Sequence, residues 1–298
     1  MSRPDELPAH LEPSKLGTKE YWDELYTSEL RNHAADPSDI GTVWFDDSDA
    51  EAKTVELLDD LLSEQQQSDP LSAHPSTAEL IPPKHLASLL DLGCGNASLL
   101  FTLRAAGWTG RARGVDYSPH SIALARQVGA SLASSRADQD DDDDAGDNDE
   151  GNGRRESPTH PPAPVELDVW DVLGGPFDAV LDGAQVSGWD VVLDKGTFDA
   201  ISLASQSDDA QGRRPCESYC DRVLRLVRPG GLFVITSCNW TEEELVKWFA
   251  STPDASGDAR EQQQRPGRFV VRGRIQYRTF NFGGVKGQTI STMAFVKQ

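Results

Sequence analysis

The segment Asp91-Leu92-Gly93-Cys94-Gly95-Asn96 combines residue types that suit cofactor binding. A glycine turn directly after an apolar run lets the backbone approach a ligand, because a side chain on Gly93 or Gly95 would fill the space that the ligand needs. The G-x-G-x-x-G pattern of dinucleotide-binding folds is incomplete, since Ser98 occupies its last position. The turn therefore predicts a nucleotide-like cofactor and argues against a nicotinamide dinucleotide. A tight strand-to-helix turn without a ligand is the alternative.

Two carboxylates flank this turn in the chain. Asp91 directly precedes it, where it would repel a pyrophosphate but attract the ammonium of a methionine moiety, directly or through water. Asp116 follows Gly95 by 21 residues, the position from which an acidic side chain takes both ribose hydroxyls. Tyr117 is expected to lie against an adenine, and Asn96 to border the same cofactor. The pairing predicts S-adenosylmethionine.

The next candidates follow the third apolar segment, over residues 165–172. Asp171 and Val172 are expected to contact the adenine amino group and ring. Asp168 is the alternative, and Asp171 is preferred because ligands lie beyond the carboxyl ends of strands.

Two later segments supply the residues expected near the group that accepts the methyl. Asp194 begins Asp194-Lys195-Gly196-Thr197 at the end of the fourth apolar segment, and we expect it to contact the cofactor and orient a target amine. A solvated turn is its alternative reading. Asn239 and Trp240 follow the fifth segment and are expected to line the acceptor channel. Trp44, with Phe45 beside it, is expected to close the cofactor pocket. For Trp44 and Trp240, core packing is an equal alternative.

The elements that must position these residues alternate along the chain. Short apolar runs at 86–93, 111–116, 165–172, 189–196 and 231–238 predict strands, and the stretches around them show helical spacing. Two final runs, separated by Gly-Gly-Val-Lys-Gly, predict two strands joined by a loop. The pattern predicts an α/β fold, a doubly wound and mostly parallel sheet with an antiparallel C-terminal hairpin.

Low-complexity stretches interrupt this pattern. We expect a disordered lead over residues 1–15 and one domain over 16–298, with insertions at about 63–85, 131–164, 204–215 and 251–266. Residues 138–150 hold nine acidic groups in thirteen positions, and such a run repels itself and buries nothing.

Composition limits the partners. A net charge of −21 argues against nucleic acid, which requires clustered Lys and Arg, and favours a basic protein. The four cysteines are scattered and the six histidines isolated, so neither a disulfide framework nor a metal site is expected. No segment is typical of a signal peptide or a membrane span. We expect a cytoplasmic protein, and nothing in the sequence requires an oligomer.

Several segments also resemble a known family. Leu-Asp-Leu-Gly-Cys-Gly-Asn, Gly-Val-Asp-Tyr-Ser, Asp-Lys-Gly-Thr-Phe-Asp-Ala-Ile-Ser-Leu and Ser-Cys-Asn-Trp-Thr are similar to segments of seven-stranded class I methyltransferases of the elongation factor methyltransferase 4 type. The resemblance implies a Rossmann-like fold, S-adenosylmethionine and a lysine of translation elongation factor 1-alpha as methyl acceptor. The chain departs from the family at Ala97, where glycine is usual, and in the acidic insertion.

Two other functions are compatible with the same residues. One is a methyltransferase for a small molecule, since this fold serves many acceptors. The other is a non-catalytic protein that keeps the cofactor pocket as structure and works in intracellular transport.

Overall fold

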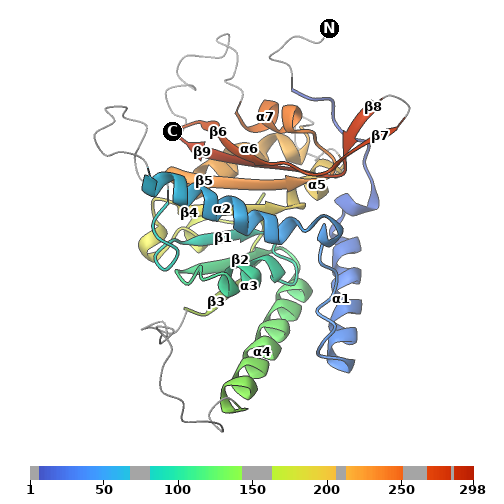
Figure 1. Ribbon diagram of the computed structural model, residues 1–298. Coiled ribbons are helices and arrows are strands. Elements are labelled where there is room, and N and C mark those ends of the chain that lie inside the picture. The colour runs from blue at the N-terminus through green and yellow to red at the C-terminus, as the bar shows by residue number, and fades with distance from the viewer. Residues whose placement is uncertain (1–6, 68–80, 143–162, 206–212, 251–266, 283–284) are drawn as a thin grey trace.

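The central sheet has seven strands, in the order β3-β2-β1-β4-β5-β9-β6 (Figure 1). The computed structural model describes residues 7–67, 81–142, 163–205, 213–250, 267–282 and 285–298. The strands are β1 (Leu89–Leu92), β2 (Ala112–Asp116), β3 (Val165–Val169), β4 (Trp189–Lys195), β5 (Val227–Ser237), β6 (Phe269–Ile275) and β9 (Ser291–Lys297). Strands β1 to β5 pair in parallel, whereas β9 is antiparallel to both β5 and β6. The predicted doubly wound sheet with an antiparallel end is confirmed.

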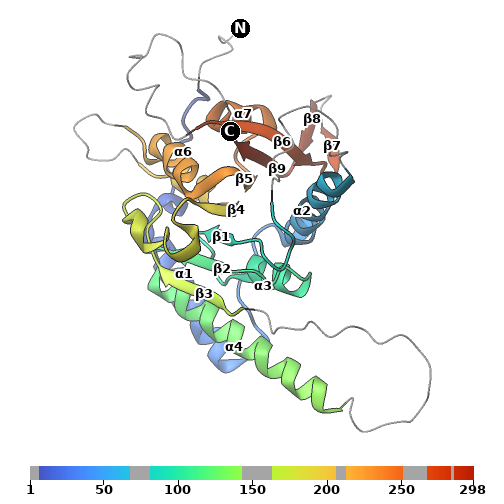
Figure 2. The same ribbon diagram turned by 90° about the vertical axis from the view of Figure 1, so that its left-hand side faces the viewer.

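Helices cover both faces of the sheet, because alternate residues of each buried strand point to opposite sides. On one face lie α2 (Ala50–Gln67), α3 (Ser98–Ala105) and α4 (Pro119–Asp142). On the other lie α5 (Thr197–Ser202), α6 (Pro215–Leu226) and α7 (Glu242–Phe249). Helix α1 (Lys19–Ala35) runs beside α4, away from the sheet (Figure 2). The two large apolar clusters therefore lie between the sheet and its two helical layers.

Capping side chains and a glycine define several helix ends, and apolar spacing defines the buried face of a helix. Thr241 and Glu244 form a capping box at the start of α7, each side chain accepting the other residue's backbone N–H. Gly107 has φ +89° directly after α3, the left-handed conformation in which a glycine ends a helix. Leu99, Leu100 and Leu103 form the buried face of α3.

Four boundaries differ from the expected ones. Helix α2 extends to Gln67 and α4 to Asp142, so both continue into stretches read as loop or disordered insertion. Polar residues continue a helix once its buried face has been fixed by packing. Strand β3 ends at Val169, before Asp171. The residues between the last two sheet strands form a separate hairpin, β7 (Thr279–Phe282) with β8 (Val285–Gln288), instead of a plain loop.

The N-terminal lead is also more structured than expected. Residues 7–14 approach α5 and α6, and the first short helical turn, η1 (Lys15–Gly17), follows them. The Ser14 N–H donates to the Leu203 carbonyl at 3.0 Å, and the Arg214 guanidinium donates to the Leu11 carbonyl at 2.9 Å. These contacts fix the segment through backbone groups, which carry no signal in its amino-acid composition. Residues 1–6, 68–80, 143–162, 206–212 and 251–266, which include most of the predicted insertions, lie outside the described ranges.

Candidate active site

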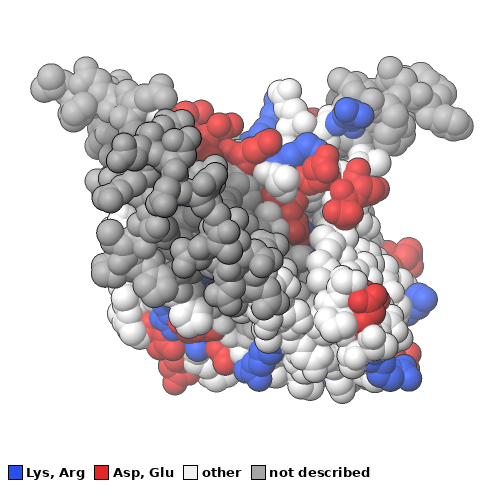
Figure 3. Space-filling view, turned by 60° about the horizontal axis from the view of Figure 1, so that its bottom comes forward, with Lys and Arg blue, Asp and Glu red and all other residues white. Residues whose placement is uncertain are grey.

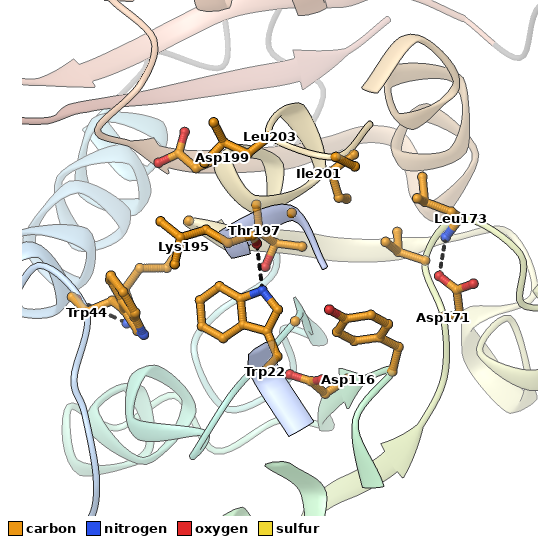
Figure 4. A pocket seen from close by; sticks show the side chains of 18 of the residues that line it. Trp22, Trp44, Asp116, Asp171, Leu173, Lys195, Thr197, Asp199, Ile201 and Leu203 are labelled. Atoms are coloured by element: carbon orange, nitrogen blue, oxygen red, sulfur yellow. Dashed lines mark hydrogen bonds between the residues drawn. The ribbon is translucent and has the colours of Figure 1, made fainter. Parts of the chain in front are cut away.

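A pocket opens at the carboxyl ends of the central parallel strands, where the winding of the chain reverses. It is lined from β1 and β2 by Gly93, Val115, Asp116 and Tyr117, and from the segment after β3 by residues 170–173. The end of β4 with α5, and the end of β5, supply the opposite side. The N-terminal segment and α1 close it, and Figure 4 shows Trp22 and Trp44 facing the cavity. The N-terminal segment and α1 contribute Leu16, Gly17, Trp22, Tyr26, Trp44 and Phe45. The end of β4, α5 and the end of β5 contribute Lys195, Gly196, Thr197, Asp199, Ala200, Ile201, Leu203, Ala204, Cys238 and Asn239.

The glycine turn has the conformation that its residue types predict. Gly93 and Gly95 have φ +62° and +58°, a region that residues with side chains rarely adopt. A methyl group on Gly93 would overlap the Thr197 hydroxyl, and one on Gly95 would lie 2.8 Å from the Tyr26 hydroxyl. Gly93 lines the pocket, whereas Gly95 lies beneath Tyr26 and shapes the pocket through it.

Asp116 connects the turn to the second strand. Its carboxylate accepts the Gly95 N–H at 3.2 Å and the Ser118 N–H at 2.8 Å, and it lines the pocket. Burial raises the pKa of Asp116 to about 6, against these hydrogen bonds, which lower it. Tyr117 lies beside it on the pocket wall, with the Lys19 ammonium 5.3 Å from its ring. Both residues are therefore where the sequence places a ribose and adenine contact.

Two other residues of the turn lie outside the pocket. Asp91 is 3% exposed, and among the described residues its carboxylate accepts no hydrogen bond. Burial raises its pKa well above the ordinary value, opposed by the nearby Lys195 ammonium. Asn96 does not reach the pocket, contrary to prediction, because its amide donates to the Ile40 carbonyl at 2.8 Å and accepts the Ser98 N–H at 3.1 Å. Asn96 therefore fixes the start of α3 against the segment before Trp44.

The segment after β3 separates the two candidate aspartates. Asp171, Val172 and Leu173 line the pocket, and the Asp171 carboxylate accepts the N–H groups of Leu173 and Gly174 at 2.9 and 3.1 Å (Figure 4). Asp168 instead forms an ion pair with Arg113 at 2.8 Å, within the sheet. The geometry favours Asp171 over Asp168 as a neighbour of the adenine.

Asp194 is not placed on the pocket wall, contrary to both of its predicted roles. Its side chain is 2% exposed and points to the α6 side of β4, where the Tyr219 hydroxyl donates to it at 2.5 Å. The N–H groups of Thr197 and Phe198, at the start of α5, also donate to it, at 2.8 and 3.0 Å. Burial raises the pKa of Asp194 to about 7. Asp194 therefore holds the first turn of α5 and acts on the pocket only through that helix.

The two candidate residues after β5, Asn239 and Trp240, lie in different surroundings. Asn239 lines the pocket, together with Cys238. Trp240 is 3% exposed and packs in the apolar cluster with Phe198 and Trp248, while its indole N–H donates to Ser202 at 3.1 Å. For Trp240 the structure favours the core-packing alternative over the acceptor channel.

The N-terminal aromatic wall is held by polar contacts. The Lys195 ammonium donates to the Trp44 carbonyl at 3.2 Å and lies 3.4 Å from Glu51 of α2. Phe45 adopts φ +65°, a strained conformation for a large side chain, and its ring packs over Gly196. The Trp22 indole N–H donates to the Leu16 carbonyl at 2.8 Å. Trp44 thus lines the pocket as predicted, at the end nearest Lys195 (Figure 4).

Comparison with known proteins identifies the family. A model of a methyltransferase domain matches residues 83–140. The yeast (Saccharomyces cerevisiae) protein-lysine N-methyltransferase EFM4 is 32% identical over 97% of this chain and 98% of its own. The human EEF1A lysine methyltransferase 2 is 29% identical over 96% of this chain and 88% of its own. The chain belongs to this family of protein-lysine N-methyltransferases. Among solved structures, a TehB-like SAM-dependent methyltransferase from Corynebacterium glutamicum covers 93% of this chain and 98% of its own at 16% identity, with a TM-score of 0.44.

The pocket fits the cofactor of a lysine methyltransferase, S-adenosylmethionine. Gly93 brings backbone to the pocket wall at a place where a side chain would overlap Thr197, and Asp116 offers a fixed carboxylate one strand away. Asp91 has no hydrogen-bond donor among the described residues, so its carboxylate can accept a hydrogen bond from a bound ammonium or water. We therefore expect Gly93, Asp116, Tyr117, Asp171, Val172 and Trp44 to hold the cofactor, with Asp91 beneath it.

Sequence reasoning missed several lining residues of this methyltransferase. Trp22 and Tyr26 carried only the signal of an amphipathic helix, which does not distinguish a core face from a pocket face. Leu203 and Ala204 line the pocket where Gly17 packs on their backbone, a close approach that only glycine allows. Lys195 and Asp199 had a usable signal, since Lys195 directly precedes the conspicuous Gly196-Thr197 pair and Asp199 follows it by two residues.

Proposed function

We propose that this chain transfers a methyl group from S-adenosylmethionine to a lysine side chain of translation elongation factor 1-alpha. The near full-length match to EFM4, at 32% identity, is the observation that carries the proposal. The relatives from Danio rerio, human and mouse are each named for EEF1A lysine methylation, at 28–29% identity. The fungal relatives are named as protein-lysine methyltransferases and the three animal relatives name EEF1A as the substrate, which favours the same substrate here.

The charge of the chain supports a basic partner. The net charge is −21, and Figure 3 shows acidic side chains gathered near the middle of one face beside a few basic ones. An acidic surface raises the association rate of a basic protein and disfavours nucleic acid. We propose accordingly that the enzyme acts as a monomer on a protein, and not on DNA or RNA.

The pocket meets the main requirement of methyl transfer, which is alignment. When bound, S-adenosylmethionine supplies an electrophilic methyl group on a sulfonium. The acceptor amine must approach in line and uncharged, although the pKa of a free lysine is about 10.4. The apolar and aromatic lining of the pocket excludes water around that amine, which lowers its pKa. The protein therefore contributes position and desolvation rather than a strong base.

We further propose a cytoplasmic location, where translation takes place. The four cysteines are free, as is usual in a reducing compartment. None of the helices in the described ranges has the length and apolar character needed to span a membrane.

The test is methylation of purified elongation factor 1-alpha with labelled S-adenosylmethionine, followed by mass spectrometry of its lysines. We expect label on one lysine with wild type and none with Asp116→Ala, which removes the expected ribose contact. Asp178→Ala, a change at a short helical turn away from the pocket, serves as the matched control and should label normally.

Three outcomes would contradict the proposal, and each supports a different function. Label confined to low-mass species in a whole lysate would indicate a small-molecule methyltransferase. Label on another protein would change the substrate but keep the reaction. Tight cofactor binding with no labelled product in any lysate would favour the non-catalytic protein of intracellular transport.

A further inference from the structure

Four buried aspartates surround the pocket, and they differ in what neutralises them. Asp91 lies near the Lys195 ammonium, and Asp116 near that of Lys19. Asp194 receives three donors from α5 and Tyr219. Asp199 is 5% exposed and lines the pocket, yet no lysine, arginine or histidine of the described ranges pairs with it. A buried carboxylate is usually paired with a cation. Because the described residues supply none at Asp199, a cationic group of a ligand can take that position.

The Asp199 carboxylate is held rigidly by the end of β5. The Ser237 hydroxyl donates to one oxygen at 2.5 Å, and the Cys238 N–H donates to the other at 2.8 Å. The Cys238 thiol and the Asn239 N–H also act on this carboxylate and lower its pKa, so its partners at the end of β5 are neutral donors and not cations. Ser237 is itself fixed, because its oxygen accepts the N–H groups of Asn239 and Trp240 at 3.2 and 3.0 Å. The group is therefore positioned before any substrate arrives.

The position of Asp199 in the pocket suits an acceptor amine. Figure 4 shows it at the same end as Lys195 and Trp44, away from Asp171 and Leu173, which border the expected adenine site. Cys238 and Asn239 line the pocket on the adjoining strand end. The reacting end of the cofactor lies opposite its adenine, so this is the end at which the substrate nitrogen must enter.

Electrostatics in this region also favour a cation. Asp199 and Asp194 repel each other, and burial raises the pKa of both. A positive group on the pocket side of Asp199 would relieve this repulsion and lower the pKa of Asp199. Lys195 does not supply that charge, since it is engaged by Glu51 and the Trp44 carbonyl.

We propose that Asp199 is the catalytic residue that binds the ε-amino group of the substrate, and that Asp194 positions it by holding the first turn of α5. The inference rests on the proposed function in requiring an amine as acceptor. Asp199 binds the ammonium as it enters, which by itself raises the pKa of the amine, and desolvation by the apolar lining opposes that rise. Once the proton has left to water, the carboxylate keeps the nitrogen directed at the methyl donor. The carboxylate forms no covalent bond in this role.

The experiment compares Asp199→Asn with Asp190→Asn. Asp190, at the opposite end of β4, is the control because its carboxylate also accepts a serine hydroxyl and a backbone N–H, both from Ser88. It differs from Asp199 in being paired with a cation of the protein, Arg228, at 2.5 Å. We expect Asp199→Asn to lower kcat/KM for elongation factor 1-alpha by about 10- to 100-fold, since a hydrogen bond between charged groups is lost. Asp190→Asn should keep kcat/KM, and Asp199→Glu should recover part of it. Affinity for S-adenosylmethionine should be unchanged in Asp199→Asn.

The role of Asp199 in binding the amine can also be measured without a protein substrate. With S-adenosylhomocysteine present, the amides N-acetyl-lysine methylamide and N-acetyl-norleucine methylamide are titrated and followed by NMR. Wild type should prefer the lysine amide, and Asp199→Asn should lose that preference, which a merely structural role would not affect. Equal preference in both proteins, or none in wild type, would overturn the role of Asp199. Failure of wild type to label elongation factor 1-alpha would instead overturn only the proposed substrate.

Discussion

The two sides of the pocket are built in different ways. On the side of β1 and β2, the backbone of a glycine turn forms the wall, and Gly93 and Asp116 lie where their spacing in the chain predicts. On the side of β4 and β5, side chains form the wall. There the predicted Asp194 and Trp240 point into the core, whereas the predicted Asn239 and the unpredicted Lys195 line the pocket.

The difference follows from the geometry of a strand. Successive side chains of a strand point to opposite faces, so a shift of one residue exchanges core for pocket. Asp194 faces Tyr219 of α6 and Lys195 faces Glu51 of α2, on opposite sides of the same sheet. A glycine turn is tolerant of such shifts because its function lies in the backbone. The cofactor side is therefore easier to read from sequence than the acceptor side.

The largest effect is expected from Trp240→Ala, which tests the division between core and pocket residues on the side of β4 and β5. Removing this buried ring should lower the free energy of unfolding by about 3–5 kcal/mol, because a cavity remains among Phe198 and Trp248. Asn239→Ala, the matched change at the adjoining pocket residue, should cost no more than about 0.5 kcal/mol. Urea denaturation of both variants measures this. A comparable loss in Asn239→Ala would show that the end of β5 is not divided into core and pocket residues.

A second prediction concerns the glycine turn. Gly93→Ala combines a left-handed φ with overlap of the Thr197 hydroxyl, which donates to the Leu92 carbonyl at 2.6 Å. We expect a loss of about 2–3 kcal/mol in unfolding free energy and weaker cofactor binding.

Gly107→Ala is the matched control for that change. Gly107 has φ +89° but only the Lys84 side chain, 4.0 Å away, near the added methyl group. The cost should be the backbone strain alone, about 1–2 kcal/mol, with cofactor affinity kept. Equal stability losses and equal cofactor affinities in the two variants would mean that contact with Thr197 does not matter.

Local signals and long-range contacts differ in how well the sequence predicts them. The strands of a mostly parallel sheet and the cofactor turn follow from hydrophobic runs and glycine positions, which are local signals. The contact of Gly17 with Leu203 joins residues far apart in the chain and was not predictable from either segment. Asp199 lies one helical turn after β4, and its burial depends on Ser237 of another strand. The acceptor side therefore required the fold before its residues could be assigned.

A third prediction tests the ribose contact through its pH dependence. Two hydroxyls that donate to Asp116 would stabilise its ionised form, so cofactor binding should weaken when this carboxylate becomes protonated. Because the pKa of Asp116 is about 6, affinity for S-adenosylhomocysteine should fall as the pH is lowered through that value. Asp116→Asn should bind about 10- to 100-fold more weakly near neutral pH and lose this dependence. Calorimetric titration across the range measures both.

Asp171→Asn provides the contrast for Asp116. Both carboxylates accept two backbone N–H groups, but Asp171 is exposed whereas Asp116 is 4% exposed, so water competes more strongly for a hydrogen bond to Asp171 and its contribution to cofactor binding should be smaller. A larger loss of affinity in Asp171→Asn than in Asp116→Asn would reverse the roles assigned to the two strand ends.

The smallest expected effect comes from Tyr219→Phe, on the acceptor side but outside the pocket. The change removes the donor to Asp194 and keeps the ring stacked on Phe198 at 5.3 Å, so the cost should be about 1 kcal/mol. Burial raises the pKa of Asp194 from 3.8 to about 7, so this group favours the folded state most below pH 3.8, and that contribution is lost as the pH rises to 7.

Loss of the Tyr219 donor raises the Asp194 pKa further, because that hydrogen bond stabilises the ionised form. The destabilisation by Tyr219→Phe should therefore be greater at about pH 8 than at about pH 5, where Asp194 is protonated in both folded proteins. Chemical denaturation at the two pH values measures the difference, with wild type as reference. Asp194→Asn, which has no charge to lose, should remove the pH dependence of the Tyr219→Phe effect in the double variant. If the effect of Tyr219→Phe persists unchanged at both pH values, Asp194 does not titrate in this range, and its hold on α5 is independent of charge.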